Sequence, residues 1–204
     1  MITGKINTLI FDFGGVLYDI DPAKAYGQFK SNSLRPDSLP DIAALSREGT
    51  AFTLYETGML ADEQFRESVS RDFCLQSANA GFDKMWNSLL VGINPESLGI
   101  ITELSRKYRL LLLSNTNPIH FNKFEPECRE LFGFFEKLYL SFELGLRKPN
   151  REIYDYVIKD SGIIPKETIF IDDSPENANA AAKAGLNAVV FTGWQSLMAE
   201  LTGL

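Results

Sequence analysis

Histidine and cysteine are scarce in this chain, and their scarcity removes several kinds of active site. The 204 residues include one histidine and two cysteines. A catalytic triad would have to use His120, and no Gly-x-Ser-x-Gly turn supplies a partner for it. Cys74 and Cys128 lie far apart, so we expect neither a disulfide framework nor a thiolate zinc site. We expect His120 to lie at the surface or at the start of a helix rather than against substrate.

Long apolar runs and clusters of basic residues are also lacking. No run approaches the roughly 20 apolar residues that cross a bilayer, and the amino-terminal residues lack the profile of a signal peptide. The net charge is -7, whereas nucleic-acid binding depends on clustered Lys and Arg. We therefore expect a cytoplasmic protein, monomeric or homodimeric, with no nucleic-acid or membrane partner.

From residue 95 onward, predicted helices alternate with short apolar strands, which is typical of a parallel α/β sheet covered on both faces. Strands are expected at 8–11, 109–113, 137–140, 168–171 and 187–191. Helices are expected after Asn94-Pro95-Glu96, over 153–158 with an end at Gly162, from Ser174 to Gly185, and from Trp194.

The segment 18–94 has a different character. It shows no convincing strand, and apolar residues such as Phe65, Val69 and Phe73 recur at helical spacing. Because the first strand needs parallel neighbours, and these come only after residue 108, we expect 18–94 to be a helical cap inserted between the first two strands. The core would then comprise residues 1–17 and 95–204. The aromatic residues of 18–94 are expected to pack inside the cap.

Polar residues follow several predicted strands at the points where the strands end. In open parallel sheets, ligands bind in the crevice outside the carboxyl ends of the strands. Each polar residue alone is explained by a turn or a helix cap, but their common position favours one shared site. The set is Asp12, Ser114-Asn115, Lys148 and Asp172-Asp173.

This set has the chemistry that phosphoryl transfer to a carboxylate requires. An aspartate such as Asp12 can attack phosphorus and form an acyl phosphate, which splits one difficult displacement into two easier steps. A lysine and a divalent cation would offset the negative charge, and hydroxyl, amide and backbone N–H groups would donate to the phosphoryl oxygens. Mg²⁺ prefers oxygen ligands, and Asp12 and Asp172 can supply them.

Four motifs in this order resemble those of the haloacid dehalogenase superfamily. They are Phe11-Asp12-Phe13-Gly14-Gly15-Val16, Leu113-Ser114-Asn115-Thr116-Asn117, Gly145-Leu146-Arg147-Lys148-Pro149 and Ile171-Asp172-Asp173-Ser174. The resemblance covers essentially the whole chain and is strongest to small bacterial phosphatases of the glucose-1-phosphate phosphatase type. It implies a Rossmann-like three-layer α/β/α core, an inserted helical cap and Mg²⁺.

The same resemblance implies roles for the phosphate-binding residues. Asp12 would be the nucleophile, and Lys148 would steady both Asp12 and the phosphoryl group. Ser114 and Asn115 would bind the phosphoryl group.

A metal site is implied as well. Mg²⁺ would be held by Asp12, by the backbone carbonyl of Gly14 and by Asp172, while Asp173 would act through a water molecule.

Gly14 departs from the usual phosphatase pattern, in which a second aspartate at this position serves as general acid and base. Such assistance is typically worth ~10² to 10⁴ in rate. The leaving group can be a good one, as the anomeric oxygen of a sugar 1-phosphate is; another acid, Asp19 or Asp21, or a water can deliver the proton; or turnover is slow or absent. Asp19 and Asp21 are more simply interpreted as loop or helix-cap residues.

The sequence therefore predicts a Mg²⁺-dependent phosphatase that acts on a small phosphorylated metabolite through an aspartyl phosphate on Asp12. One alternative is a metal-independent 2-haloacid dehalogenase. The adjacent acids Asp172 and Asp173 argue against it, because a site for an anionic haloacid gains nothing from them without a cation. The other alternative is a protein that binds phosphate ligands without turnover.

Overall fold

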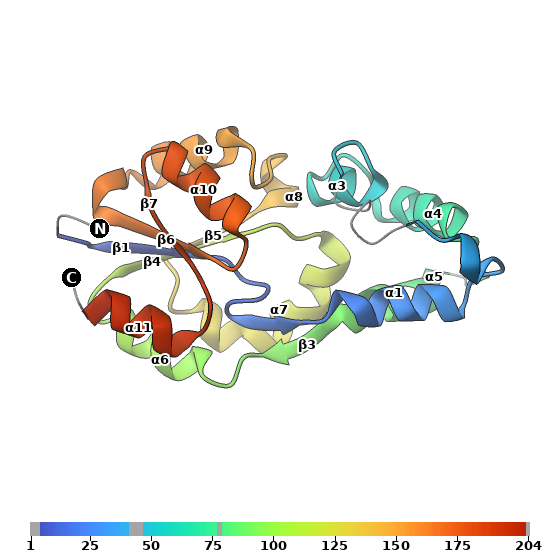
Figure 1. Ribbon diagram of the computed structural model, residues 1–204, viewed down its shortest axis with the longest axis horizontal. Helices are drawn as coiled ribbons and strands as arrows, with labels where there is room; N and C mark the ends of the chain where they lie inside the picture. The colour runs from blue at the N-terminus through green and yellow to red at the C-terminus, as the bar shows by residue number, and fades with distance from the viewer. Residues whose placement is uncertain (1–4, 41–46, 77–78, 203–204) are drawn as a thin grey trace.

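A five-stranded parallel sheet forms the centre of the larger part of the molecule (Figure 1). The computed structural model describes residues 5–40, 47–76 and 79–202. The strand order is β5-β4-β1-β6-β7, which places β1 between β4 and β6. The strands are β1 (Thr8–Phe11), β4 (Arg109–Ser114), β5 (Lys137–Leu140), β6 (Thr168–Asp172) and β7 (Asn187–Val190).

Helices cover both faces of this sheet (Figure 1). Alternate strand residues point to opposite faces, so Leu9 and Phe11 enter one buried cluster and Ile10 enters another. The first cluster includes residues of α6 (Ser97–Leu104), α7 (Pro118–Phe132) and α11 (Trp194–Thr202). The second includes residues of α9 (Arg151–Ser161) and α10 (Pro175–Lys183). The predicted three-layer α/β/α core is confirmed.

Between β2 (Tyr18–Ile20) and β3 (Leu90–Ile93) the chain forms an elongated helical part beside the core (Figure 1). Its aromatic residues pack into a cluster of their own, as in the stacked rings of Tyr55 and Phe65, whose centroids are 4.1 Å apart. We retain 18–94 as the proposed cap. Its helices are α1 (Pro22–Ser31), η1 (Pro36–Ser38), α3 (Ala51–Glu56), α4 (Asp62–Asp72), α5 (Asn79–Trp86) and η2 (Asn87–Leu89).

A two-stranded antiparallel ribbon lies at the base of the cap, so the expectation of no strand within 18–94 was wrong. β2 (Tyr18–Ile20) pairs with β3 (Leu90–Ile93), with Tyr18 opposite Ile93. Strands of three and four residues are too short for a period-two pattern to emerge from the sequence. The ribbon brings the two ends of the cap together.

Most predicted core elements lie where they were expected. The sequence offered only a helix start at His120 and did not predict the full helix α7, which contains Pro126, a residue that normally disfavours helix interiors. Helix α6 starts at Ser97, directly after Asn94-Pro95-Glu96 as expected, and ends at Leu104. Helix α9 ends as expected at Gly162, whose φ is 64°. Among the described residues, no helix has the length and apolar character needed to cross a membrane.

Candidate active site

Asp12 projects from the end of the central strand. Its backbone N–H donates to the carbonyl of Ile171 at 2.8 Å, which continues the pairing of β1 with β6 beyond the strand. Its side-chain Oδ1 accepts hydrogen bonds from the backbone N–H of Phe13 at 2.7 Å and from Nζ of Lys148 at 2.8 Å. Neither contact involves Oδ2. One carboxylate oxygen is therefore fixed in place while the other takes part in neither bond.

Lys148 lies between two carboxylates in a nearly water-free position. Its Nζ lies 2.8 Å from Asp12 and 2.6 Å from Oδ2 of Asp172, and the residue is 1% exposed. The ring of Phe170 lies 5.5 Å from the same nitrogen. A buried ammonium is tolerated only with paired charges and hydrogen bonds, and these contacts supply them.

Asn115 holds the backbone of Lys148. Its side-chain oxygen accepts from the Lys148 N–H, and its side-chain NH₂ donates to the Lys148 carbonyl, each at 2.9 Å. This reciprocal pair joins the loop after β4 to the segment that follows α8 (Ser141–Leu144). Asn115 thus positions the lysine, and its carboxamide is already engaged on both sides.

Asp172, the last residue of β6, is fully buried and uses both of its oxygens. Oδ1 accepts from the N–H of Ser174 and from Nδ2 of Asn177, each at 2.9 Å. Oδ2 accepts from Nζ of Lys148 at 2.6 Å and from the same Asn177 nitrogen at 3.1 Å. A carboxylate offers about four acceptor positions, and these four contacts account for them.

Asp173 is exposed and faces the loop after β1. A Cβ atom on Gly15 would lie 2.3 Å from Oδ2 of Asp173, and the φ of Gly15 is +81°. Only glycine allows the loop to approach this carboxylate so closely. Oxygen atoms of Asp12, Asp172 and Asp173 all lie within 4.8 Å of one another.

Charge in this cluster is unbalanced. Burial raises the pKa of Asp12 to about 7, against the opposing effect of Lys148 and with a further contribution from Asp172. Burial acts against the ammonium of Lys148, but Asp12 and Asp172 outweigh it and raise its pKa. Burial and the charge of Asp172 also raise the pKa of Asp173. Three carboxylates thus face one ammonium, and a divalent cation would restore the balance.

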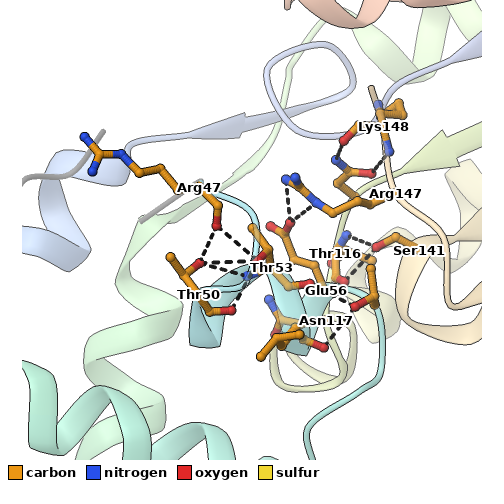
Figure 2. A network of polar contacts seen from close by, with 12 residues as sticks. Arg47, Thr50, Thr53, Glu56, Thr116, Asn117, Ser141, Arg147 and Lys148 are labelled. Atoms are coloured by element: carbon orange, nitrogen blue, oxygen red, sulfur yellow. Dashed lines mark hydrogen bonds and ion pairs between the residues drawn. The ribbon is translucent and has the colours of Figure 1, made fainter. Parts of the chain in front are cut away.

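A cavity of about 340 Å³ lies between the core and the cap, and its lining includes Gly14, Ser114 and Asn115, which lie at the ends of β1 and β4. Glu56 of the cap also lines it and pairs with Arg147 of the core, whose Nη2 lies 3.0 Å from Oε2 (Figure 2). The side chains are 26% and 18% exposed, respectively. Burial raises the pKa of Glu56, although Arg147 opposes the shift. The ion pair links the two parts of the molecule beside the cavity.

The turn after β4 is fixed by internal hydrogen bonds. The hydroxyl of Ser141 accepts from the N–H of Thr116 at 2.9 Å and donates to its carbonyl at 3.0 Å (Figure 2). Asn117 caps α7 by accepting from the N–H of His120 at 3.0 Å. These contacts hold Ser114, which is 3% exposed, at the edge of the cavity.

His120 begins α7 as expected, but it is buried rather than at the surface. Its Nδ1 lies 3.0 Å from Nδ2 of Asn117, its Nε2 lies 3.3 Å from the carbonyl of Trp86, and its ring stacks on that indole. Nδ1 therefore accepts and Nε2–H donates, as in a neutral imidazole. Burial lowers the pKa of His120 to about 3. Both nitrogens serve the fold.

The predicted site residues at the strand ends do meet, whereas the two candidate acids after Gly14 have structural partners elsewhere. Asp19 accepts from Nδ2 of Asn94 at 3.0 Å, and Asp21 caps α1 by accepting from the N–H of Ala23 at 3.1 Å. Neither is among the cavity-lining residues, so both match their interpretation as loop and helix-cap residues.

Three residues at or beside the candidate site were missed from the sequence. Asn177 stands one helical turn after Ser174, and an asparagine in a first helical turn is an ordinary feature. Glu56 and Arg147 are 91 residues apart, and no local pattern relates them. A single sequence cannot reveal such a pair, because nothing in it links two residues that are far apart along the chain.

Comparisons with known proteins agree with this geometry. The family model for haloacid dehalogenase-like hydrolases matches residues 6–185. A D-ribitol-5-phosphate phosphatase of Bacteroides thetaiotaomicron is 35% identical over 88% of this chain and 89% of its own length. A sesquiterpene phosphatase of Aspergillus oryzae is 24% identical over 96% of this chain and 94% of its own length.

Solved structures show the same architecture. A haloacid dehalogenase family enzyme of Bacteroides thetaiotaomicron, in complex with magnesium and inorganic phosphate, superposes with a TM-score of 0.81 at 32% identity, covering 94% of this chain and 98% of that one. An L-2-haloacid dehalogenase of Xanthobacter autotrophicus gives a TM-score of 0.64 at 18% identity, over 97% of this chain and 83% of that one. The second likeness concerns the fold alone.

Proposed function

Because this chain belongs to the haloacid dehalogenase-like hydrolase family, we propose that it hydrolyses a phosphomonoester of a small metabolite, with Asp12 as nucleophile. The observation that carries the proposal is the contact of Lys148 with both Asp12 and Asp172 beside a cavity lined by Ser114. Two relatives named as phosphatases and a similar structure with bound magnesium and phosphate support it.

The reaction proceeds in two balanced steps. An oxygen of Asp12 attacks phosphorus, the ester P–O bond breaks, and the alcohol leaves after taking a proton. Water then attacks phosphorus of the acyl phosphate, which releases inorganic phosphate and restores Asp12. Lys148 holds the other oxygen of Asp12 in place and adds positive charge next to the transferring group. Ser114 and the backbone N–H of Asn115 are the proposed donors to the phosphoryl oxygens.

The donor set fits Mg²⁺, since it consists of oxygen atoms from three clustered carboxylates. Asp12, the carbonyl of Gly14, Asp172 and Asp173 would form the metal site, and the cation would neutralise charge on the phosphoryl group. The four hydrogen bonds that Asp172 already accepts favour Asp173 as the acid in direct contact and Asp172 as the one that supports the site. This reverses the division of roles that the family resemblance implied.

Gly14 has no acidic side chain, so the leaving group must take its proton from another source. A sugar 1-phosphate would need little assistance, because an anomeric oxygen departs more readily than a simple alkoxide, and a water in the cavity can protonate it. A screen should therefore contain 1-phosphates and 6-phosphates of the same sugars, together with nucleotides and acyl phosphates.

Asp12→Asn tests the nucleophile. Phosphate release from the best substrate of the screen is expected to require Mg²⁺, to stop on addition of chelator, and to fall at least about 10³-fold in the variant. Thermal unfolding of the variant provides the control that the fold is retained. Release of chloride from 2-haloacids at a rate unchanged by chelator would instead identify a dehalogenase. Binding of phosphate without any hydrolysis would identify a non-catalytic protein.

A further inference from the structure

The cavity beyond the catalytic cluster has mainly aromatic and aliphatic walls. Side chains of α1, of η2 and of the β2–β3 ribbon supply the aliphatic part, including Ile20 and Leu90. Six rings supply the rest: Phe13, Tyr26, Phe29, Phe52, Trp86 and Phe124. Ser114 and Asn115 stand where the cavity meets the core, and the proposed phosphoryl position is at that end.

Several polar groups along these walls are already engaged within the protein, whereas Nε1 of Trp86 makes no hydrogen bond to a described residue. The hydroxyl of Thr53 donates toward the backbone carbonyls of Arg47 and Thr50, each at 3.2 Å (Figure 2). Asn117 and His120 bond to each other, and the hydroxyl of Tyr26 donates to the carbonyl of Pro40 at 3.1 Å.

Glu56 contacts Arg147 through Oε2 alone, and Oε1 makes no hydrogen bond to any described residue. Oε1 of Glu56 and Nε1 of Trp86 could each pair with one hydroxyl group, but a substrate with many hydroxyl groups would leave most of the others without partners on these walls, which is unfavourable.

We propose that the alcohol part of the substrate is a compact, largely apolar ring or branched chain rather than a free sugar or polyol. This substrate class rests on the proposed phosphatase function. The cavity of about 340 Å³ has room for about eleven groups of the size of water, at ~30 Å³ each. A six-membered carbon ring fits that space, gains affinity as its surface leaves water, and packs against the aromatic rings.

A matched pair of esters tests the substrate class. Cyclohexylmethyl phosphate and glucose 6-phosphate both carry the phosphate on a primary carbon attached to a six-membered ring, and they differ chiefly in the hydroxyl groups and the ring oxygen. We expect kcat/KM for the carbocyclic ester to exceed that for the sugar ester by about 10- to 100-fold. Equal values, or a preference for the sugar ester or for a sugar 1-phosphate, would overturn the proposed substrate class and leave the phosphatase function in place.

Ile20 lines the cavity and is 38% exposed, so substituting it changes the cavity wall without disturbing the buried core. Ile20→Asn is expected to lower the ratio of the two kcat/KM values about 5-fold. Val91, which is 52% exposed on the paired strand and does not line the cavity, provides the matched control Val91→Asn, with an unchanged ratio. Equal ratios in the two variants would contradict the assignment of this wall.

A phosphonate separates binding from hydrolysis. In 2-cyclohexylethylphosphonate a methylene group replaces the ester oxygen, so the compound cannot be hydrolysed. Calorimetry with Mg²⁺ is expected to show binding with a negative heat-capacity change, the mark of apolar burial. Binding of the phosphonate without hydrolysis of any ester would reject the proposed function and keep the apolar cavity. Absence of both binding and hydrolysis would overturn both proposals.

Discussion

At the scale of single residues, the main feature of the candidate site is that its charged side chains are held in place by hydrogen bonds and ion pairs. Lys148 is held at its nitrogen by two carboxylates and at its backbone by Asn115, so it does not have to be ordered when substrate arrives. Asp172 is immobilised in the same way by Asn177. In the proposed reaction, such preorganisation would place positive charge next to the transferring phosphoryl group.

Asn177→Ala removes the side chain that orients Asp172. We expect apparent Mg²⁺ affinity to fall about 10- to 100-fold, as is typical when a hydrogen-bond partner that supports a metal site is lost. Titration of phosphatase activity against Mg²⁺ measures the effect. Asn179, an exposed residue of the same helix, gives the control Asn179→Ala, which is expected to behave as the parent protein. Equal Mg²⁺ affinities in the two variants would contradict a role for Asn177 in the metal site.

His120 should make stability depend on pH. Its pKa is lowered to about 3 in the fold, against 6.5 in an unfolded chain. Between these values the unfolded chain binds the extra proton, so this contribution to stability is complete above pH 6.5 and is lost as pH falls, by up to about 1.4 kcal/mol per pH unit. Chemical denaturation at pH 7, 5 and 4 should show a shallower decline for His120→Gln. Parallel curves would show that His120 is protonated in the native protein.

At the scale of elements, the loop after β1 determines the close packing of the site. Phe13 turns into the core, Gly14 borders the cavity, and Gly15 lies against Asp173. The loop is held by three hydrogen bonds to the carbonyl of Phe13, from the N–H groups of Val16, Leu17 and Tyr18. A strand end and a tight loop together bring backbone and carboxylates within reach of one ligand.

Gly15→Ala is expected to abolish activity. Its Cβ would lie 2.3 Å from the Asp173 carboxylate, and the positive φ of +81° is unfavourable for alanine. Gly27→Ala is the matched control, because Gly27 is exposed in α1 with no atom within 4 Å of the added Cβ. That variant should be fully active and slightly more stable, by about 0.5–1 kcal/mol. Phosphatase assays and thermal unfolding of both variants measure the difference, and an active Gly15→Ala protein would contradict the close approach.

At the scale of the whole molecule, two parts with separate buried clusters share one cavity. The ion pair between Glu56 and Arg147 is a direct polar link between them (Figure 2). It lies beside the cavity and is mostly shielded from water, so it should influence how the cap sits over a bound substrate.

Glu56→Gln and Arg147→Gln are each expected to lower kcat/KM about 10-fold. The double variant should lose little more than either single one, because each change breaks the same link. Steady-state kinetics of the three variants give the coupling. Arg151→Gln is the control, since Arg151 pairs with Asp155 on an exposed helix face and such pairs contribute little. Independent, multiplying losses from Glu56 and Arg147 would mean that the pair does not act as a unit.

Features that depend on residues close together in the sequence were predicted correctly, whereas contacts between residues far apart in the sequence were not. The core strands were predictable because strands buried on both faces are continuous apolar runs, and the four motifs could be placed because each follows such a run. The β2–β3 ribbon could not be predicted, because neither strand is long enough to show an alternating pattern by itself. Reciprocal contacts such as those between Asn115 and Lys148 depend on the folded path of the chain, which no local pattern encodes.

The ribbon at the base of the cap has a consequence for the architecture of the chain. Tyr18 lies opposite Ile93, so the points where the polypeptide leaves and re-enters the core are one strand spacing apart, ~5 Å. Two residues suffice to connect antiparallel strands at that distance. Replacing the intervening helices by such a turn would rejoin β1 to α6 without stretching any other connection. The helical segment could therefore be exchanged for a different one grafted at the same two residues, which would place another substrate pocket over the proposed active site.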